Sequence, residues 1–355
     1  MCEHLHASRD GLMLGSERFF LKGASYFGME TDILVPHGLW GGAASTTIAR
    51  VSTLLRSNGF NLIGNEVALL HKFEGRELRY LDVLDYTVGE IGRHRLLILL
   101  DMHVLHAGQS IPELWHDGSI SDEAFTRAWT TLAHRYSSVK HVVGADLNNE
   151  PHGAASWGDG NPSTDWRLAA TRIGAAVLQV NPRWLVFVEG VQCTKEDVDR
   201  EGSPCCWGED LQAARCHPIE LSVPDRLVYS PHTYGPAVAH QPYIDSPTFP
   251  NNLPAIWNSH FGFLGASTPL VIGEFGGQLK LPKDAQWQRA FVQYLTQARG
   301  ISGVIYWCVN CNSGDTDGLL CDDWNTPRDD VLDLLSVFHG SPVPASLLPV
   351  HHGGV

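Results

Sequence analysis

Two glutamates, Glu150 and Glu274, each stand at the end of a short apolar stretch of this sequence. Glu150 lies in GADLNNEPHG (residues 144–153), and Glu274 lies in VIGEFGG (271–277). Polar groups where a buried strand ends either leave the core for solvent or face a ligand. Two carboxylates held about 5–5.5 Å apart can cleave a glycosidic bond, one as nucleophile at the anomeric carbon and the other, with a raised pKa, as proton donor to the departing oxygen. The alternative, that each Glu pairs with a nearby Lys or Arg, is much weaker for both residues together than for either one alone.

The elements that must position these carboxylates follow a repeating pattern. Short apolar or β-branched runs bounded by turn residues predict eight strands, at Phe19–Tyr26, Phe60–Gly64, Leu96–His103, His141–Glu150, Trp184–Gly190, Leu227–Tyr234, Leu270–Gly276 and Val304–Asn310. Apolar residues at three- and four-residue steps predict helices between them, at Ser45–Asn58, Glu123–Tyr136, Asp165–Val180 and Lys283–Arg299. Eight alternating units of this kind predict an α/β fold, a (β/α)8 TIM barrel formed by a single domain.

No composition break or long Ser/Pro-rich linker divides the chain. We therefore expect residues 1–340 to form the barrel domain, with a hairpin from Gly11 to Lys22 that caps the bottom of the barrel. The segment after Ser341 is rich in Pro, Gly and His, and we expect residues 341–355 to be a C-terminal tail that wraps the surface or frays.

Barrel enzymes carry their chemistry at the carboxyl ends of the strands. The predicted strands have polar or aromatic residues at these ends, namely Asp101, His103, Asn149, Glu150, His232, Tyr234, Glu274 and Trp307. Glu150 and Glu274 end strands that are three positions apart, so they can face each other across the mouth. Asn149 can bond to a sugar hydroxyl beside the acid, aromatic rings can stack on sugar rings, and the histidines can exchange hydrogen bonds with hydroxyls.

The bulk composition excludes several classes of function. Hydrophobic residues make up 43% of the chain and charged residues 18%, which is the composition of a globular protein. The net charge of −14 repels phosphate backbones, so we expect no nucleic-acid partner. The longest purely aliphatic run, Leu96–Leu100, is far shorter than the roughly 20 residues that cross a bilayer, so we expect no membrane span.

The eight cysteines and 18 histidines do not form a metal-site pattern. Cys308-Val-Asn-Cys311 has the spacing of half a zinc site, but no second pair of this spacing occurs. We therefore expect no metal and no organic cofactor. Eight cysteines are too few for a disulfide scaffold in a chain of this length, and they leave the redox compartment open.

Five motifs, taken together and in this order, resemble glycoside hydrolase family 5, a family of barrel glycosidases. They are DMH (101–103), LNNEPHG (147–153), VYSPHTYGP (228–236), VIGEFGG (271–277) and YWCVN (306–310). Each motif alone is a weak signal, whereas five in the family's order are a strong one. Further segments, among them DWRLAA (165–170) and SGDTDGLLCDDW (313–324), resemble the bacterial cellulase branch of the family.

The resemblance implies a monomeric, retaining endo-β-1,4-glucanase that acts on β-glucan chains without a cofactor. It assigns Glu150 as acid/base, Glu274 as nucleophile and Asn149 as the partner of the 2-hydroxyl, with Tyr234 poised against Glu274. It also implies secretion, although the first 25 residues show no basic start followed by an apolar stretch, so a cytoplasmic location stays an alternative.

The resemblance further implies that His103, His232 and Trp307 line the subsite of the attacked sugar. Trp40, in HGLWGG, and Trp207 are candidates for outer subsites. For these two tryptophans, ordinary packing in the core or in a loop is an equally good interpretation.

The chain departs from the family pattern at the second strand. The family usually has Asn-x-x-Arg-x-Pro there, and the Arg lies beside the nucleophile and helps to keep it ionised. Here GFNLIGNEVALL has neither Arg nor Pro after Asn61. Either Gly64 substitutes for the Arg, or a deletion of about four residues joins Ile63 directly to the following loop. Cysteine pairs that secreted relatives often carry near the first and fourth strand loops are also absent, so disulfides of that kind are not expected.

Two alternatives to a cellulase stay open. The same machinery could act on mannan, on β-1,3-glucan or on a glycolipid, because the subsite loops choose the sugar. The missing Arg at Gly64 also leaves open a protein that binds carbohydrate but turns it over weakly.

Overall fold

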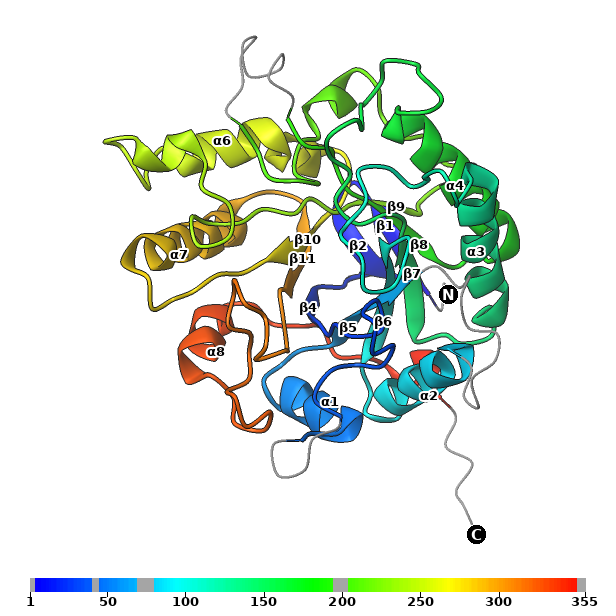
Figure 1. Cartoon of the computed structure of the whole chain (residues 1–355), viewed down its shortest axis with the longest axis horizontal. Coiled ribbons are helices and arrows are strands. Elements are labelled where there is room, and N and C mark those ends of the chain that lie inside the picture. Colours follow the sequence, from blue (N-terminus) through cyan, green and yellow to red (C-terminus); the bar gives the residue numbers. More distant parts are fainter. Residues whose placement is uncertain (1–3, 40–44, 69–79, 194–203, 350–355) are drawn as a thin grey trace.

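Eight parallel strands close into a barrel in the computed structural model, which describes residues 4–39, 45–68, 80–193 and 204–349. In barrel order these strands are β4 (Leu21–Ser25), β5 (Leu62–Ala68), β6 (Leu97–Val104), β7 (Val142–Asp146), β8 (Leu185–Val188), β9 (Leu227–Tyr229), β10 (Leu270–Phe275) and β11 (Ile301–Tyr306). Figure 1 shows the strands at the centre and helices around them. The predicted (β/α)8 barrel is confirmed, and each predicted strand overlaps an observed one.

Helices lie between the strands and cover the outside of the barrel. They are α1 (Ile48–Ser57), α2 (Tyr80–Arg93), α3 (Asp122–Arg135), α4 (Trp166–Val180), α6 (Leu253–His260), α7 (Pro282–Gln297) and α8 (Asp329–Leu335). Three of them begin where a side-chain oxygen accepts a backbone N–H of the first turn, at Thr47, Ser121 and Asp165. The four helices predicted from the sequence are therefore confirmed to within a few residues at either end. No helix in the described ranges combines the length and the apolar character that crossing a bilayer requires.

The inside of the barrel is apolar at the bottom and polar at the mouth. The apolar inner cluster contains Leu21, Leu62, Leu97, Leu99, Val143, Leu185, Phe187, Val228, Val271 and Ile305. Further along the same strands the inner side chains become carboxylates, imidazoles and amides. The inner cluster therefore closes the barrel below the site, and the chemistry is confined to the mouth.

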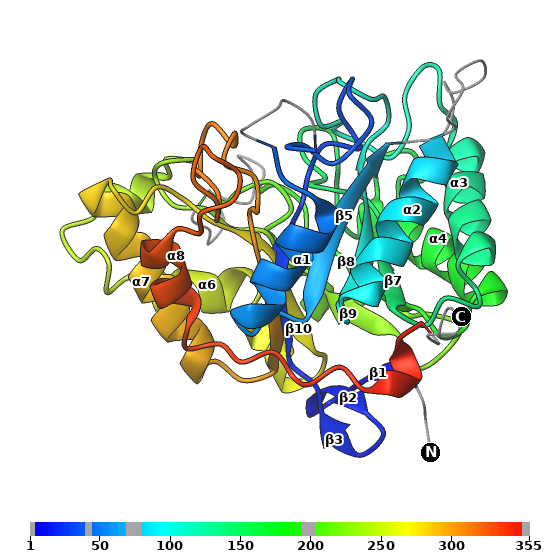
Figure 2. The ribbon, with the colours of Figure 1, turned by 90° about the horizontal axis from the view of Figure 1, so that it is seen from below.

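Three short antiparallel strands cover the bottom, as Figure 2 shows. They are β1 (Leu5–Ser8), β2 (Gly11–Leu14) and β3 (Glu17–Arg18). The predicted hairpin is confirmed at its start, because β2 begins at Gly11 and pairs with β3, but it ends at Arg18, since Lys22 belongs to β4. Lys22 fits in a barrel strand because its ammonium group donates to the carbonyl of Asn58 and lies over the ring of Phe60.

The last described residues pack against this end of the barrel. The hydroxyl of Ser341 accepts a hydrogen bond from the backbone of Phe20 at 2.8 Å, and its carbonyl accepts one from the side chain of Asn61 at 2.9 Å. Leu347 is buried in the inner cluster together with Leu5 and Leu12. Up to residue 349, the segment therefore wraps the bottom of the barrel.

The second strand continues past Gly64, where the family's Arg is missing. β5 continues past Ile63 to Ala68 and pairs in register with β6, with Gly64 opposite Leu99 and Glu66 opposite Asp101. The residues that follow Ile63 therefore continue the strand and do not form a loop. Gly64 occupies a regular strand position.

Candidate active site

Glu150 and Glu274 meet at the mouth of the barrel. Glu150 follows β7, Glu274 lies in β10, and both are largely buried. One carboxylate oxygen of Glu150, one of Glu274 and one ring nitrogen of His232 all lie within 4.8 Å of one another. The expectation that the two glutamates face each other across the mouth is confirmed.

His232 lies between the two carboxylates. Its Nδ1 is 3.3 Å from Oε1 of Glu150 and 3.5 Å from Oε2 of Glu274. Its Nε2 is 3.3 Å from Oε1 of Glu189, a fully buried residue directly after β8. The imidazole is thus held by three carboxyl groups from three different strand ends.

Glu189 also fixes the backbone of Glu150. Glu150 has φ +47, in the left-handed region that a non-glycine residue seldom adopts. Oε2 of Glu189 accepts a hydrogen bond from the Glu150 N–H at 2.9 Å, and Nδ1 of His152 lies 2.7 Å from the Glu150 carbonyl oxygen. Sequence reasoning missed Glu189, although a charged residue at the end of the buried run Leu185–Val188 was a signal for it.

Tyr234 forms a hydrogen bond with Glu274 that favours the ionised carboxylate. Its hydroxyl donates to Oε2 of Glu274 at 2.6 Å. Burial, followed by the negative charge of Glu150, raises the pKa of the Glu274 carboxyl well above its ordinary value. The charge of His103 and the hydrogen bond from Tyr234 oppose this rise, because both favour the ionised carboxylate.

His103 carries a positive charge in this site. Its Nδ1 lies 2.7 Å from Oδ2 of Asp101, and its ring stacks on Trp307 at 5.3 Å between centroids. Burial alone would lower the pKa of His103, but the hydrogen bond and charge of Asp101, together with Glu274 and Glu30, raise it to about 10. The side chain is therefore an imidazolium at neutral pH.

Three neighbouring strands place carboxyl groups side by side below the catalytic pair. Glu66 of β5 is opposite Asp101 of β6, which is opposite Asp146 of β7, and all three are buried. Burial raises the pKa of Glu66 to about 8, with Glu30 and Asp101 adding to the rise and His103 opposing it. Within the described residues, each of the three has one carboxyl oxygen without a hydrogen-bond partner.

No Lys or Arg of the described ranges forms an ion pair with either catalytic glutamate. The basic side chain that contacts both carboxylates is His232. A Cβ atom on Gly64 would lie 3.1 Å from the Ser25 hydroxyl and 3.6 Å from Oε1 of Glu66. The strand position that carries Arg in the family is therefore next to a carboxyl group here.

Asn149 is a buried amide without a hydrogen-bond partner for its side chain among the described residues. It is 1% exposed, and neither its amide nitrogen nor its amide oxygen has a partner among the described residues. Its backbone is fixed by a hydrogen bond from its N–H to the Met102 carbonyl at 3.1 Å. A buried amide with both ends free is costly unless a bound group or water satisfies it.

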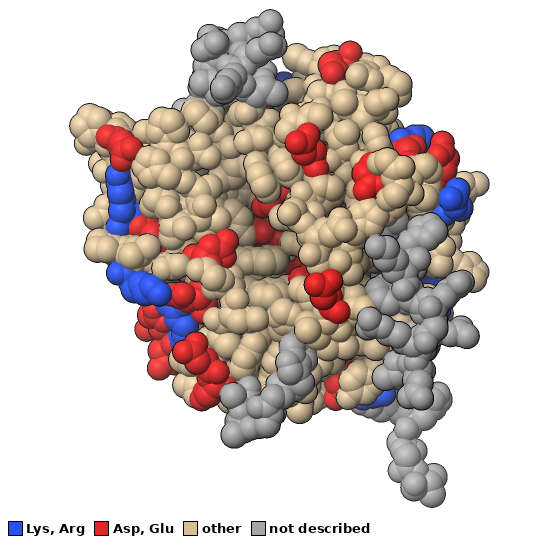
Figure 3. Space-filling model, in the orientation of Figure 1, with Lys and Arg blue, Asp and Glu red and all other residues tan. Residues whose placement is uncertain are grey.

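Two adjoining hollows form the cleft. A cavity of about 420 Å³ is lined by the catalytic pair and by His103, Gln192, Trp207, Tyr234, Val238, Trp307 and Asp315, among others. A second hollow of about 740 Å³ shares His103, Ile111 and Trp207 with the first and reaches Glu30 and His37. Figure 3 shows acidic side chains within the central hollow of this face, whereas Lys and Arg lie toward the outer edge of the molecule.

The three tryptophans predicted to bind sugar differ in where they lie. Trp307 lines the first cavity, as expected. Trp207 is 39% exposed, lines both hollows and stacks on His152 at 3.7 Å with nearly parallel rings. Trp40 lies outside the described residues. Roles of these residues in binding sugar stay predictions.

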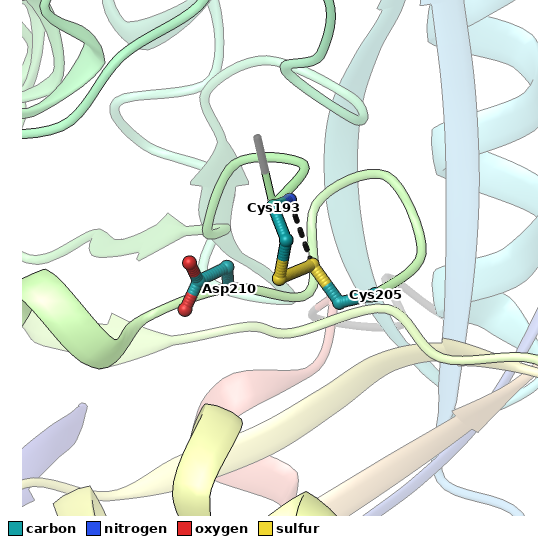
Figure 4. Close-up of side chains that lie close together, drawn as sticks. All are labelled: Cys193, Cys205 and Asp210. Carbon is teal, nitrogen blue, oxygen red and sulfur yellow. Dashed lines mark hydrogen bonds between the residues drawn. A yellow bond between two sulfur atoms is a disulfide. The ribbon is translucent and has the colours of Figure 1, made fainter. Parts of the chain in front are cut away.

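A disulfide that the sequence did not reveal joins Cys193 to Cys205 beside the first cavity (Figure 4). Cys308 and Cys311 carry free thiols and belong to none of the possible metal-ligand groups found among the described residues. One such group is the catalytic pair with His232, and another is Asp146, Glu189 and His232.

Known proteins of similar sequence and structure share one family. The model of the family described as Cellulase (glycosyl hydrolase family 5) matches residues 19–313. An endoglucanase of Paenibacillus polymyxa is 40% identical over 342 residues, which cover 90% of this chain and 83% of that protein. The major extracellular endoglucanase of Xanthomonas campestris pv. campestris is 39% identical, over 90% of this chain and 68% of that protein.

Solved structures agree with this assignment. The catalytic domain of the Xanthomonas campestris pv. campestris endoglucanase superposes with a TM-score of 0.83 at 37% identity, covering 92% of this chain and 97% of that one. An endocellulase of Pyrococcus horikoshii, solved in complex with cellotetraose, superposes with a TM-score of 0.85 at 34% identity, covering 94% and 98% of the two chains.

Proposed function

The chain belongs to glycoside hydrolase family 5, and we propose that it is an endo-β-1,4-glucanase that cleaves β-glucan chains with retention of anomeric configuration. The observation that carries this proposal is the approach of Glu150 and Glu274, which have carboxylate oxygens within 4.8 Å of each other. Retaining enzymes hold their carboxyl groups about 5–5.5 Å apart, whereas inverting enzymes leave about 6.5–9.5 Å for a water molecule between them. The short approach therefore supports double displacement.

In the first step, ionised Glu274 attacks the anomeric carbon of the sugar bound above it. The bond from that carbon to the glycosidic oxygen breaks, and protonated Glu150 gives its proton to the departing oxygen. In the second step, Glu150 takes a proton from water, and the water oxygen displaces Glu274 from the same carbon. Two inversions give net retention.

His103 gives Glu274 a cationic neighbour, although the Arg of the family's second strand is missing. It is an imidazolium held by Asp101, it lines the cavity that contains both glutamates, and its charge favours the ionised form of Glu274. Gly64 therefore does not leave the nucleophile without a cation. This arrangement favours an active enzyme over a protein that only binds carbohydrate.

The remaining site residues orient the attacked sugar. The unpartnered amide of Asn149 accounts for the 2-hydroxyl contact, which strengthens in the transition state. Trp307 offers an aromatic face in the cavity, and Tyr234 holds Glu274 in place by its hydrogen bond.

Trp207 belongs to the side of the site where the leaving sugars bind. Glu150 must contact the departing oxygen, so the leaving sugars lie beyond Glu150 as seen from Glu274. Trp207 stacks on His152, and His152 contacts the Glu150 carbonyl. With more than a third of its surface exposed, Trp207 is a platform for a sugar ring there.

Two further features support cleavage within long chains and export of the protein. The cleft continues through two adjoining hollows, which suits a long chain bound in the middle. The Xanthomonas relative is named an extracellular endoglucanase, and the Cys193–Cys205 disulfide fits an oxidising compartment, so we infer that this protein is also exported.

Hydrolysis of carboxymethylcellulose, mannan and laminarin, followed by release of reducing ends, tests the substrate class. The proposal predicts that carboxymethylcellulose is cleaved fastest and that its viscosity falls early, as internal cleavage requires. Faster cleavage of mannan or laminarin would show that one of these glycans, and not a β-1,4-glucan, is the preferred substrate. Binding of cello-oligosaccharides without release of reducing ends would show that the protein binds carbohydrate and does not hydrolyse it.

A further inference from the structure

We propose that the Cys193–Cys205 disulfide positions Trp207 for the leaving sugars, so that its reduction weakens cleavage of oligosaccharides and spares substrates that lack a leaving sugar. This inference rests on the proposed function. It concerns a pair of cysteines that the catalytic steps do not use.

The disulfide joins two segments that both adjoin the catalytic centre, and Figure 4 shows the bond between them. Cys193 lies just beyond Gln192, whose N–H donates to the carbonyl of Pro151 at 3.1 Å, and Pro151 directly follows Glu150. Cys205 lies two residues before Trp207. The bond therefore ties the start of the Trp207 segment to the backbone beside the acid/base residue.

The chain is fixed on both sides of Trp207, and before Trp207 the covalent link is the disulfide at Cys205. After Trp207, Gly208 has φ +69, and its carbonyl accepts the N–H of Gly190 at 2.9 Å. A Cβ on Gly208 would lie 2.3 Å from Oε2 of Glu189, so the chain there passes against the residue that fixes Glu150. Before Trp207, Cys206 makes a 2.8 Å hydrogen bond to Glu209 and a weak 3.8 Å contact from its thiol to the Tyr234 carbonyl.

Among the described residues, His152 is the ring that stacks on the indole. The two ring centroids are 3.7 Å apart, and Trp207 also lines both hollows of the cleft. A platform held by one stack and its own backbone loses orientation when that backbone gains freedom. Fixing a binding group before the ligand arrives improves affinity by lowering the entropy cost of binding.

The thiol of the neighbouring Cys206 does not exchange with this disulfide. Burial, and then the charge of Glu209, raises the pKa of the Cys206 thiol well above its ordinary value. A protonated, buried thiol is a poor nucleophile, so it does not attack the adjacent disulfide. Cys193 is the more exposed partner of the disulfide.

Reduction by a dithiol such as dithiothreitol balances without a further reagent. One thiolate of the reductant attacks a sulfur of the disulfide and forms a mixed disulfide, and the second thiolate then displaces the protein sulfur. Two electrons pass to the protein, Cys193 and Cys205 become thiols after taking up two protons, and the reductant becomes a cyclic disulfide.

The test compares two substrates on the full-length protein, oxidised and then reduced with dithiothreitol, with the freed thiols counted. Cellotetraose has leaving sugars, whereas an aryl β-cellobioside leaves only a phenol. We expect reduction to raise KM for cellotetraose about 5-fold, which corresponds to a loss of about 1 kcal/mol of binding free energy. The value of kcat/KM for the aryl substrate should change less than 2-fold. The Cys193→Ser/Cys205→Ser double variant should behave like the reduced protein, and Cys216→Ser, which removes an exposed free thiol, should not.

A Trp207→Ala variant separates positioning from general loosening. It should lose cellotetraose cleavage in the same direction, and reduction of this variant should then have no further effect, because the platform is already gone. Equal losses on both substrates would overturn the inference in favour of a general structural role. Reduced protein with two freed thiols and unchanged KM for cellotetraose would overturn it as well. An oxidised protein that cleaves the aryl substrate but no glucan would instead contradict the proposed function.

Discussion

Glu66→Gln tests the electrostatics below the catalytic pair. Glu66 lies in β5 two residues after Gly64, is fully buried and has one oxygen without a partner among the described residues. Its carboxyl has a pKa of about 8 in the folded protein against an ordinary value of 4.5. The folded chain therefore keeps a proton between these two pH values that the unfolded chain releases.

The sign and size of the effect follow from that difference. Because the folded state binds the extra proton, the contribution of Glu66 to the free energy of unfolding falls as the pH rises from 4.5 to 8 and is level above 8. Each pH unit in this window costs about 1.4 kcal/mol, so the loss between pH 4.5 and pH 7 is about 3 kcal/mol. Glutamine has nearly the shape of the protonated acid and does not titrate. The variant should match the parent at pH 4.5 and exceed it by about 3 kcal/mol at pH 7.

Urea denaturation at several pH values measures this difference directly, with the m-value checked for constancy. Glu17→Gln, at an exposed position of β3, is the matched control and should give parallel curves at every pH. If the free energies of unfolding of Glu66→Gln and the parent differed by the same amount at every pH, Glu66 would be ionised in the folded protein. The reasoning about this row of carboxyl groups would then be refuted.

Three other substitutions probe the site. Tyr234→Phe removes a donor to Glu274, so the acidic limb of the kcat/KM profile should move up by about one pH unit and kcat should fall about 10- to 100-fold; an unmoved limb would contradict the role of this hydrogen bond. Asn149→Ala should lower kcat/KM about 100-fold on glucosides and much less on 2-deoxyglucosides, and equal losses on both would refute the 2-hydroxyl contact. Gly64→Arg should leave the acidic limb nearly unchanged, because the guanidinium meets Glu66 and His103 already supplies the charge; a large downward shift would mean that Glu274 lacks a cation.

The strand pattern was predictable because buried parallel strands are short, apolar and bounded by turn residues. The errors lie at the strand ends that carry function. The prediction extended one strand to Glu150, whereas β7 ends at Asp146 and Glu150 adopts a left-handed conformation outside the ladder. The strand predicted to reach Tyr234 ends at Tyr229 as β9, because Pro231 cannot donate to the ladder.

Several parts of the site needed the structure. Each polar residue at a strand end could be identified in the sequence, but the bridging position of His232 and the support of Glu150 by Glu189 depend on distances between separate strands. The pairing of Cys193 with Cys205 could not be chosen among eight cysteines. The charge of His103 depends on Asp101 and on buried carboxyl groups from other elements.

The rate of phenol release from an activated aryl β-cellobioside by Glu150→Ala and Glu274→Ala tests the central claim most directly. The leaving phenol needs little protonation, so Glu150→Ala should keep much of the first step and release a rapid burst of phenol, whereas Glu274→Ala should lose activity by several orders of magnitude. Both variants should be nearly inactive on carboxymethylcellulose, because its leaving sugars need the acid as well as the nucleophile. Equal losses of the phenol burst in the two variants would contradict the assignment of Glu150 as acid/base and Glu274 as nucleophile.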